Sequence, residues 1–165
     1  MYCTTAVASA DNPPMLRILC VAVLGTLTAC SPALDWRLVT IPEAGLQASL
    51  PCKPDQVQRS VELAGTPVDM HMSGCEADGA TFAVACAAVQ DPAQTGAALT
   101  HWRAAVLAGL QAPAEGHAGA PRNTAFIPTG ALNIPPSVRT EVQGRSRDGA
   151  SVAAQAVWFA RVQGP

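Results

Sequence analysis

Hydrophobic positions between Gln56 and Val89 recur with a period of two, which predicts an antiparallel meander of three strands. Val57, Val61 and Leu63 alternate with polar residues, and the alternation resumes at Val68 after a turn at 64–67. Asp78-Gly79 is a strong two-residue turn signal that separates the second strand from the third. The third segment, 81–89, is apolar on both faces, as expected of a central strand.

Other stretches alternate in the same way or lose all periodicity. Strands are expected over 35–40 and 45–50, which end at prolines, and over 138–142 and 151–162, which are joined by an Asp148-Gly149 turn. The stretches 113–121 and 126–136 are rich in proline and glycine and read as loops.

One segment has helical spacing. Asp91 is a suitable cap with Pro92 in the first turn, and an apolar stripe follows at Leu99, Trp102, Val106 and Leu110. His101 lies off this stripe, and both it and His117 are expected to be solvated. The chain is therefore expected to form an α+β domain, an antiparallel sheet with one main helix packed on a face.

This order of elements resembles the α/β/α sandwich of PsbP-like proteins. The resemblance implies a further strand and a helix after Val162, where the sequence continues only to Pro165. The expectation is therefore a PsbP-like sandwich that lacks its C-terminal strand and helix, and a truncated copy without function is one of the alternatives.

The stretch from Met15 to Cys30 has the layout of a secretory signal: Arg17, a short apolar run over 18–27, and small residues before a cysteine. The run is shorter than the roughly 20 apolar residues of a membrane-spanning helix. Residues 1–14 contain no basic residue, so Met15 is the expected true start.

Leu27-Thr28-Ala29-Cys30 resembles the lipobox of bacterial lipoproteins. This resemblance implies cleavage before Cys30 and a diacylglycerol thioether and N-acyl lipid on that residue. No other cofactor is expected. Ser31 in place of aspartate is the residue type associated in lipoproteins with outer-membrane sorting. The resulting division is a signal peptide over 1–29, a tether over 30–34 and a single α+β domain over 35–165.

Four short stretches also resemble those of small uncharacterised proteobacterial lipoproteins. They are Asp35-Trp36-Arg37, Leu50-Pro51-Cys52-Lys53-Pro54, Gly74-Cys75 and Phe82-Ala83-Val84.

Three cysteines remain in the mature chain besides Cys30, and an exported chain is expected to bridge two of them. The Asp78-Gly79 turn would set Cys75 and Cys86 about four residues apart along their strands, roughly 13 Å, which is too far for a bridge. A turn at Gly65-Thr66 would place Gln56 opposite Cys75, with Cys52 close by. The predicted disulfide is therefore Cys52–Cys75 with Cys86 free, and the alternative is that all three are reduced and buried.

Catalytic and metal-binding motifs are not found in the sequence. His71 and Cys86 would share a sheet face and could act as a base and a nucleophile or help to bind a metal, but Met70 and Met72 would point away from His71. Cys86 lies in an apolar strand, where a thiol is usually inert. The sequence therefore favours no catalytic site and no metal site.

The charge distribution argues against nucleic-acid binding. The net charge is -2, Lys53 is the only lysine, and the arginines are scattered, so no basic stripe is available to phosphates. The leading hypothesis is a lipid-anchored, non-enzymatic envelope module that contacts the membrane through Cys30 and an envelope partner through its sheet or the loop 113–136. The alternative is a small periplasmic metal-binding or thiol-dependent protein that uses His71 and Cys86.

Overall fold

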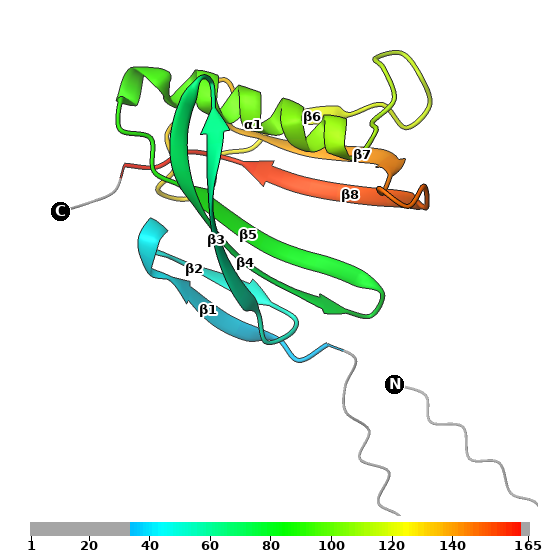
Figure 1. Ribbon diagram of the computed structural model, residues 1–165, viewed down its shortest axis with the longest axis horizontal. Coiled ribbons are helices and arrows are strands. Elements are labelled where there is room, and N and C mark those ends of the chain that lie inside the picture. Colours follow the sequence, from blue (N-terminus) through cyan, green and yellow to red (C-terminus); the bar gives the residue numbers. More distant parts are fainter. Residues whose placement is uncertain (1–33, 163–165) are drawn as a thin grey trace, which may run out of the picture. The chain divides into compact units, whose positions relative to one another are not determined.

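All strands pair antiparallel in residues 34–162, the part of the chain that the computed structural model describes (Figure 1). The predicted signal peptide, the lipobox and Cys30 lie outside the described residues. The elements are β1 Arg37–Ile41, η1 Pro42–Ala44, β2 Leu46–Leu50, β3 Asp55–Leu63, β4 Thr66–Ala77, β5 Ala80–Ala87, η2 Pro92–Gln94, α1 Thr95–Gly109, β6 Arg122–Ala125, β7 Val138–Arg145 and β8 Ser151–Trp158.

The hairpin of β4 and β5 confirms the predicted Asp78-Gly79 turn and its register. Ala77 lies opposite Ala80, Cys75 opposite Phe82, and His71 opposite Cys86. β5 is, however, an edge strand of the sheet β3-β4-β5 rather than a central one. Its apolar character has another cause, because residues of β2 and η1 lie against it.

The hairpin of β3 and β4 turns one residue earlier than predicted. Ala64 and Gly65 both have positive φ, 51° and 81°, which is the requirement of a type I′ turn. Gln56 is therefore opposite Ser73 and not Cys75, a shift of two residues. Because the shift is even, every side chain of β3 keeps its predicted face.

Helix α1 follows η2, where the Asp91 side chain accepts a hydrogen bond from the Ala93 amide, as a cap does. Figure 1 shows α1 (green) beside the β3–β4 turn and beside β7 and β8.

Two small hydrophobic clusters form along α1. The first contains Leu63, Val68 and Ala98, and the second contains Leu99, Val138 and Trp158. Trp102 packs against both clusters. Val106, predicted to belong to the apolar stripe, is 37% exposed, because the packing surface lies at the first half of the helix.

The third sheet has the order β6-β7-β8. Its strand β6 falls in a stretch for which no strand was predicted; it is short and every residue in it is exposed. β8 ends at Trp158 and not at Val162, because β7 begins at Val138, the partner of Trp158. Beyond it the Leu132 amide donates to the Ala160 carbonyl and the Arg161 side chain donates to the Gly45 carbonyl.

The described residues thus form an α+β structure of antiparallel sheets with one main helix. The strands are divided among three sheets, of two, three and three strands, where a single sheet was expected. The alternation along each strand predicts its faces, but it does not predict which edges pair. No helix in residues 34–162 has the length and hydrophobicity needed to span a membrane.

Gly144→Ala should lower the free energy of unfolding by about 1–3 kcal/mol, because a Cβ at this position would overlap the Leu110 carbonyl oxygen at the end of α1. The Arg145 amide donates to the same carbonyl at 2.6 Å, so the strand has little freedom to move away. Gly109→Ala is the matched control: a Cβ there meets nothing, and alanine favours helix by up to about 1 kcal/mol. Urea unfolding measures both, and a Gly144→Ala variant as stable as the parent would contradict this packing.

Candidate functional site

His71, Cys75 and Cys86 lie on one face of the sheet β3-β4-β5. Alternation along β4 gives His71, Ser73 and Cys75 the same face, and Phe82 and Cys86 of β5 lie opposite Cys75 and His71. Residues of η1 and the segments just before β1 and just after β2 supply the contacting groups. Three such contacts are Trp36 with Phe82, Glu43 with His71, and Cys52 with Cys75.

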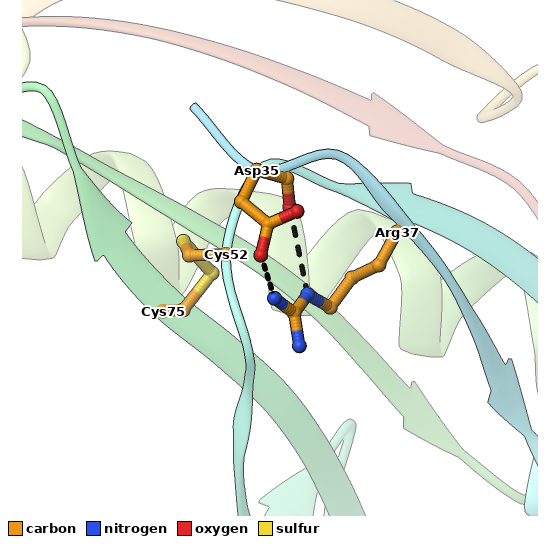
Figure 2. A network of polar contacts seen from close by, with 4 residues as sticks. All are labelled: Asp35, Arg37, Cys52 and Cys75. Carbon is orange, nitrogen blue, oxygen red and sulfur yellow. Dashed lines mark hydrogen bonds and ion pairs between the residues drawn. A yellow bond between two sulfur atoms is a disulfide. The ribbon is translucent and has the colours of Figure 1, made fainter. Parts of the chain in front are cut away.

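The predicted disulfide is confirmed: Cys52 is bonded to Cys75, with Cα atoms 5.9 Å apart, and Cys86 is free. Figure 2 shows the bridge beside Asp35 and Arg37, which form an ion pair with each other. The Asp35 amide also donates to the Pro51 carbonyl at 2.7 Å. The beginning of the described chain is thereby fixed to the segment that carries Cys52.

Glu43, His71 and Cys86 form a cluster, of which the sequence predicted the pair His71 and Cys86 but not Glu43. His71 and Cys86 are cross-strand neighbours, as expected, and the Glu43 carboxylate lies 3.8 Å from Nδ1 of His71. Burial raises the pKa of the Cys86 thiol, and the negative charge of Glu43 raises it further. Because both causes disfavour the thiolate, the cluster is a poor nucleophile–base pair.

Cys86 should therefore react with a disulfide reagent at pH 7 more slowly in the folded protein than in the denatured chain. Glu43→Gln should speed the reaction of the folded protein, because it removes the charge that opposes the thiolate. Glu62→Gln on β3 is the control and should leave the rate unchanged. The extent of Cys86 labelling is followed by peptide mass; faster labelling in the folded protein than in the denatured chain would instead indicate an activated thiol.

Among residues 34–162, no group of three or more histidine, cysteine, aspartate or glutamate side chains has the arrangement of a metal site. Of the two other histidines, His117 is exposed in the loop 113–121, as expected. His101 is also exposed, but its Nδ1 accepts a hydrogen bond from the Ala64 amide at 3.1 Å. His101 is therefore exposed as expected, and in addition it connects α1 to the β3–β4 turn.

No protein-family model matches this chain, and comparison with curated proteins and with solved structures finds no match.

The exposed face of the sheet β6-β7-β8 was not predicted as a site. Arg122, Glu141 and Gln155 lie opposite one another across the three strands, and Arg122 and Gln155 each donate to the Glu141 carboxylate at 3.2 Å. These two hydrogen bonds lower the pKa of Glu141. The three residues line an open depression of about 560 Å³.

Arg139 lies farther along the same face of β7. Its guanidinium lies 4.4 Å from the centroid of the Phe126 ring, while its buried Nε has no hydrogen-bond partner among the described residues. The alternation of Arg139, Glu141 and Gln143 is a sequence signal for a polar strand face. The residues of β6 that pair with this strand, however, fall in a stretch without periodicity. We refer to Arg122, Arg139, Glu141 and Gln155 as the polar face.

A second, more enclosed cavity lies between the β3–β4 turn and the start of α1. It has a volume of about 90 Å³ and is lined in part by Leu63, Val68 and Ala98. Small-molecule sites usually measure about 300–1,000 Å³. The open polar face is therefore a better candidate for contact with a macromolecule than this cavity is for a small ligand.

Proposed function

We propose that this chain is a lipid-anchored protein of the bacterial cell envelope that faces the periplasm, most simply from the outer membrane. It acts as a non-enzymatic binding or structural module. The observation that carries the proposal is the Cys52–Cys75 disulfide, because disulfides form and persist in oxidising compartments such as the periplasm. The lipobox ending at Cys30 supplies the route and the anchor, and Ser31 supports outer-membrane sorting.

The surface that we assign to an envelope partner is the polar face together with the loop 113–136. It is largely exposed and carries charged groups of both signs that can form hydrogen bonds, which is common at interfaces that are not permanent. The proposal includes the finer fold assignment, a PsbP-like sandwich, which the order of hairpin, meander, helix and final strands supports.

Metabolic labelling with palmitate tests the anchor. The full chain expressed in a Gram-negative host should incorporate the label, and Cys30→Ala should abolish it. Cys20→Ala is the matched control in the same leader and should label like the parent. Absence of label from the parent, or undiminished label in Cys30→Ala, would contradict the proposal.

A second candidate function remains because His71 and Cys86 do lie opposite each other. A thiol-dependent or metal-binding protein would use these two residues. The raised pKa of Cys86 argues against the thiol-dependent activity, and slower labelling of Cys86 in the folded protein than in the denatured chain would count against it as well.

A further inference from the structure

The β1–β2 hairpin has an exposed side without charge. Leu38 lies opposite Ser49 and Thr40 opposite Gln47, so these four exposed residues share one face. Trp36 precedes Leu38 by two residues and is exposed as well. We call Trp36, Leu38, Thr40, Gln47 and Ser49 the neutral face.

Two large apolar side chains dominate the neutral face. Leu38 is 67% exposed and Trp36 is 57% exposed, and among the large hydrophobic residues in 34–162 only Val162 is more exposed. The Trp36 ring meets the Phe82 ring in a T-shaped contact, with centroids 6.4 Å apart, yet more than half of the Trp36 surface stays exposed. Burial of such residues against an apolar phase is favourable.

The end of the neutral face at Trp36 is held in place by three contacts. The Asp35 amide is bonded to the Pro51 carbonyl, the Asp35–Arg37 ion pair flanks Trp36, and the Cys52–Cys75 bridge connects this corner to β4 (Figure 2). A surface whose backbone is fixed in this way loses less conformational entropy on contact with a flat partner. The ion pair also compensates the charge of Arg37 next to Trp36.

We propose that the neutral face rests on the lipid bilayer that holds Cys30, with Trp36 and Leu38 inserted at the headgroup level. This inference depends on the proposed lipidation of Cys30. Only six residue steps separate Cys30 from Trp36, which limits the distance between their Cα atoms to about 20 Å. Tryptophan prefers the membrane interface, and the exposed Lys53, next to Cys52, suits anionic headgroups.

A second function follows for the hairpin: it orients the domain on the membrane instead of leaving it free on its tether. The acyl chains on Cys30 already hold the protein at the membrane, so the contact of the hairpin adds orientation rather than anchoring.

Quenching of tryptophan fluorescence by brominated lipid tests this contact. The full chain, processed and lipidated in the host, is reconstituted into vesicles of phosphatidylethanolamine and phosphatidylglycerol with either ordinary or brominated acyl chains. The parent should lose fluorescence in the brominated vesicles. Trp36→Phe should lose no fluorescence in the brominated vesicles. Of its two remaining tryptophans, Trp158 is buried in the core and Trp102 packs against it. Leu38→Gln keeps all three tryptophans and should be quenched less than the parent.

Unchanged circular dichroism shows that the variants are folded, and the mass of the N-terminal peptide shows whether Cys30 carries lipid. A lipidated parent that is quenched no more than Trp36→Phe would overturn this inference and leave the proposed function intact. A Cys30 without lipid would overturn the proposed function and, with it, the membrane contact that depends on it.

Discussion

Trp158→Ala should lower the free energy of unfolding by about 3–5 kcal/mol, the largest effect we expect of a single substitution. Trp158 is 7% exposed and packs with Leu99 and Val138. Its ring meets Trp102 edge to face, with centroids 6.0 Å apart. Truncation would leave a cavity where α1 meets β7 and β8, and urea unfolding measures the loss.

The Trp158 indole also makes a buried hydrogen bond. Its Nε1 donates to Oγ1 of Thr140 at 3.1 Å, and the Thr140 hydroxyl donates to Oδ1 of Asn123 at 2.6 Å. Trp158→Phe keeps an aromatic ring but loses this donor, so it should cost about 1 kcal/mol for the hydrogen bond and less in total than alanine.

Val157→Ala is the matched control for Trp158→Ala. Val157 is the preceding residue of β8 and is 38% exposed, so its truncation should cost less than about 1 kcal/mol. Equal losses for Val157→Ala and Trp158→Ala would show that the second hydrophobic cluster does not hold α1 to the third sheet.

Removal of the disulfide should lower the free energy of unfolding by about 3 kcal/mol. Cys52 and Cys75 are 23 residues apart, and the bridge limits the freedom of this loop in the unfolded chain. The double variant Cys52→Ala with Cys75→Ala should unfold at lower urea concentration than the parent, and reductant should bring the parent close to the double variant.

Cys86→Ala provides the comparison, because Cys86 is the free cysteine of the described residues. It should keep the full response to reductant, whereas the double variant should not respond at all. A parent that is indifferent to reductant, or a Cys86→Ala variant that loses the response, would contradict the Cys52–Cys75 bridge.

The sequence was sufficient where a local signal set the geometry. Asp78-Gly79 determined the β4–β5 register, because an aspartate and a glycine satisfy the positive φ of a type I′ turn. The position of the β3–β4 turn was not determined by its residues, since Gly65 fits either central position of a two-residue turn. The Cys52–Cys75 bridge was still predicted correctly, because the even shift kept Cys75 on its face.

The sequence was insufficient where distant segments meet. Glu43 approaches His71 from a separate hairpin, and the His101 ring reaches the Ala64 amide across 37 residues. The polar face depends on the pairing of Arg122 with Glu141. The sequence of β6 has no apolar alternation from which this pairing could be predicted. Such contacts follow from tertiary packing, which alternation within one strand does not encode.

The mass of the N-terminal tryptic peptide of the membrane-extracted protein tests the central claim most directly, because Arg17 and Arg37 define its ends. We expect the peptide 30–37 to begin at Cys30, with a diacylglycerol thioether and an amide-linked acyl chain on that residue. A peptide 18–37 with unmodified Cys20 and Cys30 would contradict the lipid anchor and the placement of this protein in the cell envelope.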